Sequence, residues 1–127
     1  SISSRSCAEL YNMELLADSI QNYDSNHTRF ICITKEMKIY PGADRTSIMM
    51  VIPNKPGKLF SVLSRFSAIG ANLVKLESRP IPNRDFEFTF YFDIELSIYN
   101  DKFASLISEL DHCEEQFKYF GTYSEII

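Results

Sequence analysis

The stretch Phe86–Leu96, FEFTFYFDIEL, alternates between two kinds of side chain along its whole length. The apolar series is Phe86, Phe88, Phe90, Phe92, Ile94 and Leu96. The intervening series is Glu87, Thr89, Tyr91, Asp93 and Glu95. Successive side chains of a strand point to opposite faces of the sheet, so this pattern predicts a strand with one face in a core. The other face is expected to be open or covered by a partner.

Three more apolar, β-rich segments flank this strand: 46–52, 73–80 and about 115–120. Two helical stripes lie between them. The first consists of Leu59, Val62, Leu63, Phe66 and Ile69, and the second of Phe103, Leu106, Ile107 and Leu110. We expect Pro56 in the first turn of the first helix, Gly70 just after its end, and Asn100 at the start of the second.

The predicted order of elements is therefore β-α-β-β-α-β, a split β-α-β unit used twice. Right-handed crossovers place both helices on one face of a four-stranded antiparallel sheet. The expected fold class is α+β with a ferredoxin-like arrangement. The RNA-recognition modules that share this topology need exposed aromatic side chains and a basic surface, whereas here most aromatic residues fall on the predicted core face.

The N-terminal part is expected to be separate. Residues 4–20 have helical spacing, with Ser3 or Ser4 as a cap, and 28–34 resembles a strand. Residues 35–45 are charged and contain Pro41-Gly42, a linker signal. We predict an incomplete domain at 1–36, a linker at 37–45 and a complete domain at 46–127. Because the chain starts at Ser1 without a start-like region, we expect it to be a piece of a longer protein.

Composition excludes several classes of function. The net charge of −4 and pI near 5.1 argue against nucleic-acid binding. Neither a secretory signal nor an apolar run of about 18 residues is evident, so we expect no membrane association. Three cysteines without close spacing favour reduced thiols and a cytoplasmic location. The two histidines lie in separate segments, and we expect no metal and no cofactor.

The two turns that flank the first helix are candidate binding elements. Residues 54–58 offer backbone N–H groups at a helix start, where a carboxylate can bind. Residues 71–73 and 77–79 offer an amide, a carboxylate, a hydroxyl and a guanidinium. The two turns lie about 20 Å apart on one helix, so they can share a ligand only if a second subunit contributes one of them. The alternative is structural: Asn54 caps the helix, and Glu77 with Arg79 forms a solvated pair.

At GANLVKLESRP (70–80), preceded by NKPGKL (54–59), the sequence resembles an ACT domain. More narrowly, it resembles the regulatory domain of prephenate dehydratases. Gly57-Lys58-Leu59-Phe60 matches that family's first motif and Glu77-Ser78-Arg79-Pro80 its last. Lys58, Phe60 and Val74 depart from the family pattern.

This resemblance implies a homodimer that binds L-phenylalanine between two subunits. The implied ligand-binding residues are Asn54, Gly57, Lys58, Leu59, Ala71, Asn72, Leu73, Glu77, Ser78 and Arg79. The segments AELY (8–11), IQ (20–21) and NHTRF (26–30) resemble the end of the family's catalytic domain. They imply catalytic roles for Thr28, Arg29 and Phe30, with Thr28 donating to, or positioning a donor for, the leaving oxygen of prephenate.

The parent enzyme implied is a prephenate dehydratase, either alone or fused to chorismate mutase, and the fragment itself is expected to be inactive. Two alternatives stay open. One is the regulatory module of another enzyme, such as an aromatic amino-acid hydroxylase. The other is a ligand-free dimerisation module in which Lys58 and Phe60 fill the pocket.

Overall fold

The computed structural model describes residues 1–23, 28–84, 87–113 and 115–126. The chain divides into two compact units, Ser1–Ile33 and Thr34–Ile127, which are described separately.

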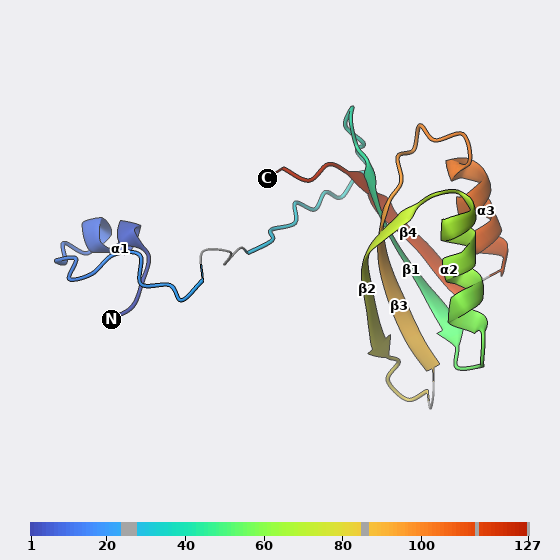
Figure 1. Cartoon of the computed structure of the whole chain (residues 1–127), viewed down its shortest axis with the longest axis horizontal. Coiled ribbons are helices and arrows are strands. Elements are labelled where there is room, and N and C mark those ends of the chain that lie inside the picture. Colours follow the sequence, from blue (N-terminus) through green and yellow to red (C-terminus); the bar gives the residue numbers. More distant parts are fainter. Residues whose placement is uncertain (24–27, 85–86, 114, 127) are drawn as a thin grey trace. The chain divides into compact units, whose positions relative to one another are not determined.

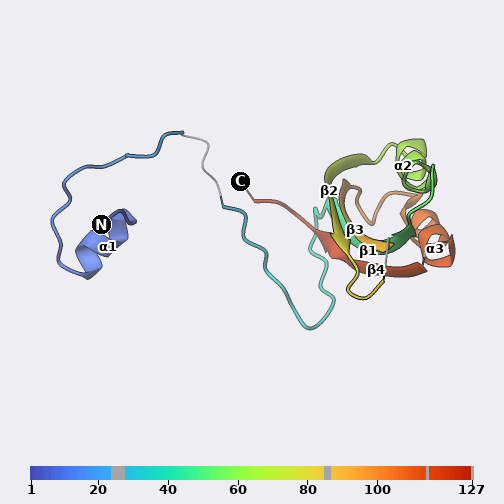
Figure 2. The same cartoon turned by 90° about the horizontal axis from the view of Figure 1, so that it is seen from below.

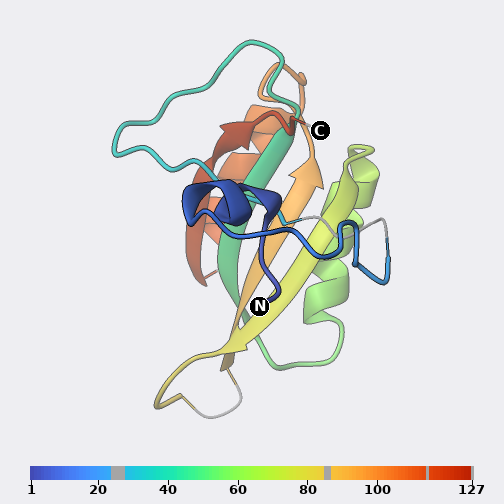
Figure 3. The same ribbon diagram turned by 90° about the vertical axis from the view of Figure 1, so that its left-hand side faces the viewer.

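In the described residues, the second unit contains four strands and two helices (Figure 1). Its elements are β1 (Arg45–Pro53), α2 (Lys58–Ala68), β2 (Asn72–Pro80), β3 (Glu87–Glu95), α3 (Phe103–Cys113) and β4 (Glu115–Tyr123). The strands pair antiparallel in the order β2-β3-β1-β4. Figure 2 shows α2 and α3 on the same side of the sheet, and Figure 3 shows the strands of the uncovered face. The predicted ferredoxin-like α+β fold is confirmed.

The core lies between the sheet and the two helices, as the alternation in β3 predicts. Phe92, Ile94 and Leu96 are buried, whereas Tyr91 and Glu95 are exposed on the opposite face. The remaining core side chains come from β1 and from both helices: Ile48, Met50, Ile52, Val62, Phe66, Leu106 and Leu110. The rings of Phe66 and Phe92 meet edge to face, with centroids 5.4 Å apart, and join α2 to the sheet. Phe86, assigned to the same apolar series, lies outside the described residues.

The start of α2 is a tight turn over Lys55–Lys58. The Lys58 N–H donates to the Lys55 carbonyl at 3.2 Å, and Gly57 has φ +80°. Proline second and a positive-φ glycine third are typical of a type II turn. Pro56 therefore precedes the helix, and its expected place in the first helical turn is wrong, because left-handed Gly57 cannot be part of a right-handed helix. The expected start of the second helix at Asn100 is also too early, because α3 begins at Phe103. The side chain of Asn100 instead accepts a hydrogen bond from the Lys102 N–H at 2.9 Å in the turn before the helix.

The end of α2 is closed by two backbone hydrogen bonds around Gly70, which has φ +75°. The Ala71 N–H donates to the Phe66 carbonyl at 2.9 Å, and the Gly70 N–H donates to the Ser67 carbonyl at 3.0 Å. These bonds define a Schellman motif, for which glycine is favoured. The motif fixes the direction in which the chain leaves α2 and enters β2 at Asn72.

Among its described residues, 1–23 and 28–33, the first unit contains one short helix, α1 (Arg5–Leu10), with Ser4 at its N-cap position. Asn12, with φ 48°, ends the helix, and the Met13 N–H donates to the Ala8 carbonyl at 2.8 Å. The predicted helix over residues 4–20 is therefore too long by about ten residues.

The predicted strand at 28–34 is also wrong, since these described residues form no strand. In both segments apolar side chains of the pattern are largely exposed: Leu16 is 92% exposed and Phe30 is 87% exposed. A short helix or a single strand gains most of its stability from the packing of such side chains. Within the part of the chain that the structure describes, every helix is too short or too polar to cross a membrane.

Candidate functional site

The two predicted binding turns lie at opposite ends of α2 (Figure 1). The helix has 11 residues, so its length is about 16 Å at 1.5 Å per residue. The structure therefore does not bring the turns at 54–58 and 71–73 together within one chain. This separation agrees with the expectation that a shared ligand would need a second copy.

The turn at the start of α2 presents backbone donors. The Lys58 N–H is used within the turn, and the Ser61 N–H donates to the Gly57 carbonyl at 2.9 Å. The intervening N–H groups of Leu59 and Phe60 belong to the first helical turn, where no carbonyl four residues earlier is available in the helix. Because the N-cap is Gly57, the structural alternative in which Asn54 caps the helix is wrong. Asn54 and Lys58 are exposed beside these donors.

The turn at the end of α2 borders an open pocket of about 460 Å³. The pocket is lined by Leu63, Phe66, Ser67, Gly70, Ala71, Asn72 and Leu73. Three of the predicted ligand-binding residues, Ala71, Asn72 and Leu73, thus lie together in one depression. The depression is open to solvent, and Leu63, Phe66 and Leu73 contribute apolar side chains to its lining.

Lys58 and Phe60 do not line this pocket. Phe60 is 73% exposed on the outer side of α2. Within one chain, their bulk therefore leaves the pocket open.

The predicted cluster Glu77-Ser78-Arg79 is divided by the pleat of β2. Glu77 lies opposite Tyr91, whereas Ser78 lies opposite Phe90, which packs against the core. Directly opposed residues in an antiparallel pair project to the same face. Glu77 and Arg79 therefore share the open face, and Ser78 is on the helix face. A single binding wall made of all three side chains is not what one chain presents.

Glu77 is held between two cations on its own strand. Lys75 Nζ lies 3.0 Å from Glu77 Oε2, and Arg79 Nη2 lies 2.5 Å from Oε1. The hydrogen bond from Lys75, followed by the hydrogen bond and charge of Arg79, lowers the pKa of the Glu77 carboxyl below its ordinary value of 4.5.

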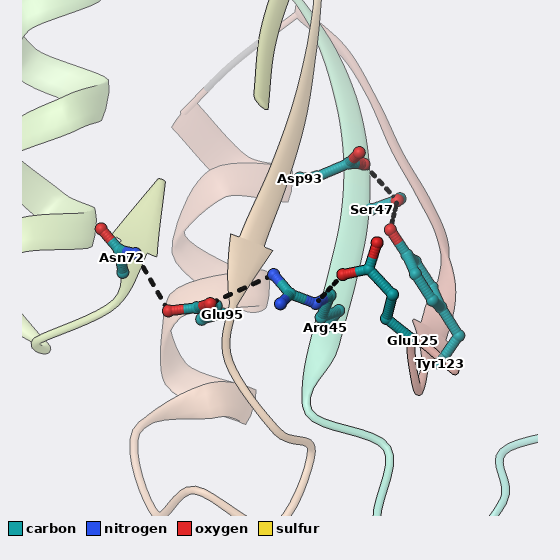
Figure 4. Close-up of polar contacts among 7 residues, drawn as sticks. All are labelled: Arg45, Ser47, Asn72, Asp93, Glu95, Tyr123 and Glu125. Atoms are coloured by element: carbon teal, nitrogen blue, oxygen red, sulfur yellow. Dashed lines mark hydrogen bonds and ion pairs between the residues drawn. The ribbon is translucent and has the colours of Figure 1, made fainter. Parts of the chain in front are cut away.

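Asn72 is engaged by residues that sequence reasoning missed. Its side-chain Nδ2 donates to Glu95 Oε2 at 2.9 Å, and Glu95 Oε1 pairs with Arg45 Nη1 at 3.1 Å (Figure 4). Arg45 Nε in turn pairs with Glu125 Oε2 at 3.0 Å. The sequence predicts only that Arg45 lies in the linker and Glu95 on the polar face of a strand. Only the strand register, which brings Asn72, Glu95 and Arg45 into one row, could have revealed them.

Thr28, Arg29 and Phe30 belong to the first unit, where all three are exposed in a segment without regular secondary structure. Their catalytic roles stay a prediction. Among the described residues, no group of three or more His, Cys, Asp or Glu side chains is placed to hold a metal ion.

A four-stranded antiparallel sheet with two helices on one face defines a ferredoxin-like domain, and its pocket lies where α2 meets the edge strand β2. The family model for prephenate dehydratase matches residues 1–38. The bifunctional chorismate mutase/prephenate dehydratase of Aquifex aeolicus is 31% identical over 126 residues, which are 99% of this chain and 35% of that protein. The chloroplastic arogenate dehydratase 4 of Arabidopsis thaliana is 34% identical over 141 residues, covering 96% of this chain and 33% of the relative.

Among solved structures, a prephenate dehydratase from Arthrobacter aurescens in complex with L-Phe matches with a TM-score of 0.62 and 25% identity. The match covers 72% of this chain and 30% of that one. Residues 1–38 therefore match the prephenate dehydratase family, and the chain over nearly its whole length is similar to one part of proteins that bear that name. It spans about a third of the length of the curated relatives described above.

Proposed function

We propose that residues 46–127 form the L-phenylalanine-binding regulatory domain of a prephenate dehydratase, and that residues 1–36 belong to its catalytic domain. The observation that carries this proposal is the pocket at the end of α2. It lies at Ala71, Asn72 and Leu73, in a fold shared with a relative crystallised in complex with L-Phe.

The chemistry of the two turns suits a free amino acid. Leu63, Phe66 and Leu73 offer an apolar surface to the aromatic ring. The amide oxygen of Asn72 can accept from the ammonium group, and the first N–H groups of α2 suit the carboxylate. Because these groups occupy both ends of α2, the proposed site is completed by the helix start of a second subunit. The functional form is therefore a homodimer.

For the whole protein, the proposed reaction converts prephenate to phenylpyruvate, water and carbon dioxide. Thr28 would donate to, or position a donor for, the departing hydroxyl, with Arg29 and Phe30 beside it. Arogenate is a second candidate substrate, since one relative is named an arogenate dehydratase. We expect this chain alone to turn over neither substrate.

The two competing functions are less well supported. The match of residues 1–38 to the prephenate dehydratase model disfavours a regulatory module of a hydroxylase. A ligand-free dimerisation module would need Lys58 and Phe60 to fill the pocket, but neither side chain lines it in this chain.

Regulation by the proposed site requires that L-phenylalanine bind two conformational states of the dimer with different affinity.

The test is titration calorimetry of the full chain with L-phenylalanine, with L-tyrosine as the control and light scattering to record the mass in solution. We expect selective binding of one L-phenylalanine per chain by a dimer. Leu73→Ala should weaken binding, whereas Leu76→Ala should not, because Leu76 lies on the same strand but outside the pocket. A folded dimer that gives no binding heat would overturn the proposal.

A further inference from the structure

One residue from each strand forms a row across the end of the sheet (Figure 4). In this row Asn72 lies opposite Glu95, Glu95 opposite Arg45, and Arg45 opposite Tyr123. We call these four residues the sheet-end row. It begins at the pocket, because Asn72 is both the first residue of β2 and a pocket-lining residue.

Both carboxylate oxygens of Glu95 are occupied by neighbours in the row. Oε2 accepts from Asn72 Nδ2 at 2.9 Å, and Oε1 meets Arg45 Nη1 at 3.1 Å. The contact with Asn72 is a hydrogen bond, whereas the contact with Arg45 is an ion pair without hydrogen-bond geometry, so Arg45 holds Glu95 in place through its charge. Since the Asn72 side-chain amide is planar, the bond from its NH₂ group also sets the direction of its oxygen, which points away from Glu95 (Figure 4).

Arg45 is the anchor of this arrangement. Its side chain is only 18% exposed, and its Nε pairs with Glu125 at 3.0 Å on the side away from Glu95. A partly covered guanidinium between two carboxylates is screened less than an exposed pair. Removal of the guanidinium would leave Glu95 and Glu125 as neighbouring like charges without their shared counter-charge, so Glu95 would move from its place in the row.

We propose that Arg45, acting through Glu95, is a positioning residue that holds the Asn72 amide in its ligand-binding orientation. Binding of the ligand by Asn72 rests on the proposed phenylalanine site, whereas the orientation of the Asn72 amide by Arg45 and Glu95 does not. This separation allows the two to be tested independently.

The first test follows the Asn72 side-chain amide by ¹⁵N NMR in the full chain without ligand. We expect Arg45→Met and Glu95→Gln to shift these signals. Arg65→Met is the matched control, since Arg65 is similarly covered and pairs with Glu109 on α3 at 3.0 Å. Asn72 amide signals that stay unchanged in Arg45→Met would overturn the proposal.

The second test is a double-mutant cycle, read by calorimetric titration with L-phenylalanine. Arg45→Met should weaken binding roughly three- to tenfold, as expected for a hydrogen-bonded contact that loses its support. In the Asn72→Ala background the same change should have no further effect, because Arg45 acts through Asn72. An equal loss in both backgrounds would show a merely structural role and overturn the proposal.

If the wild-type chain does not bind L-phenylalanine, the proposed function fails and the amide shifts alone decide the role of Arg45. If Arg45→Met does not fold, Arg45→Lys takes its place in both measurements. A lysine keeps the positive charge but lacks the planar guanidinium that reaches both carboxylates. Arg45→Lys should therefore give a smaller shift of the Asn72 signals and a smaller loss of affinity than Arg45→Met. No shift at all would again contradict the proposal.

Discussion

Arg79 pairs with Glu77, two residues earlier on the open face of β2, with Nη2 and Oε1 2.5 Å apart. Lys75 approaches the other carboxylate oxygen at 3.0 Å. The three side chains therefore act as one electrostatic unit along an edge strand. Ser78, between Glu77 and Arg79 in sequence, projects to the other face and is not part of it.

This unit predicts a titration of Glu77 at lower pH than an ordinary glutamate. The lowered pKa means that its ion pairs stabilise the fold above the ordinary value of 4.5 and are lost as the pH falls through the folded-state pKa. A ¹³C NMR titration of the Glu77 carboxyl measures this directly. Arg79→Met should move the midpoint upward, toward 4.5.

Arg84→Met is the control for that titration, since Arg84 pairs with Glu87 at 3.0 Å in a separate ion pair. It should leave the Glu77 midpoint unchanged. A Glu77 midpoint that is the same in the wild type, Arg79→Met and Lys75→Met would show that these contacts do not form in solution.

Gly70 should be required for its backbone conformation alone. An added Cβ at Gly70 would meet no atom within 4 Å, but its φ of +75° is unfavourable for other residues. Gly70→Ala is expected to lower the free energy of unfolding by about 1–2 kcal/mol. Gly70→Asn should cost less, because asparagine tolerates this conformation. Urea unfolding of the wild type and the two variants measures the order of their stabilities. A Gly70→Ala variant as stable as the wild type would contradict the prediction.

Phe66 should contribute far more to stability than Phe60, although both belong to α2. Phe66 is buried against Phe92, whereas Phe60 is 73% exposed. Phe66→Ala is expected to lower the free energy of unfolding by about 3–5 kcal/mol. Phe60→Ala, the same change at an exposed site, should stay within about 0.5 kcal/mol. Denaturant unfolding tests both, and similar losses would mean that α2 packs through a different face.

Thr46 should stabilise the core through its hydroxyl. The buried Thr46 Oγ1 donates to the Leu96 carbonyl at 2.7 Å and lies 2.9 Å from Thr122 Oγ1. Thr46→Val keeps the shape of the side chain but removes the hydroxyl, so both partners lose a hydrogen bond. This loss is expected to lower the free energy of unfolding by about 1–2 kcal/mol. Thr89→Val, the same change on the open face of β3, is the control and should have little effect. Thermal unfolding of both variants measures the difference, and equal midpoints would contradict it.

Much of the second unit could be predicted because its signals are local. The alternation from Phe88 to Leu96 predicted the buried face of β3, and the stripe from Leu59 to Ile69 predicted α2. The errors at the start of α2 were small, since they concerned only how the turn around Gly57 leads into the helix.

The first unit was predicted poorly for a physical reason. Residues 4–20 and 28–34 have apolar patterns typical of packed elements, but periodicity does not say whether a packing partner is present. Leu16 and Phe30 are exposed. The packing energy that would stabilise a longer helix or a paired strand is therefore not gained at these side chains.

The sequence by itself determined the order of strands and helices, the face of β3 in the core, and the glycines at both ends of α2. These follow from side-chain periodicity and backbone preference, which act over a few residues. The tertiary structure alone decided that Asn72, Glu95 and Arg45 form one row, because strand register depends on pairing between distant segments. It also decided that the pocket lies between α2 and the start of β2, since a surface shared by two elements exists only once they pack.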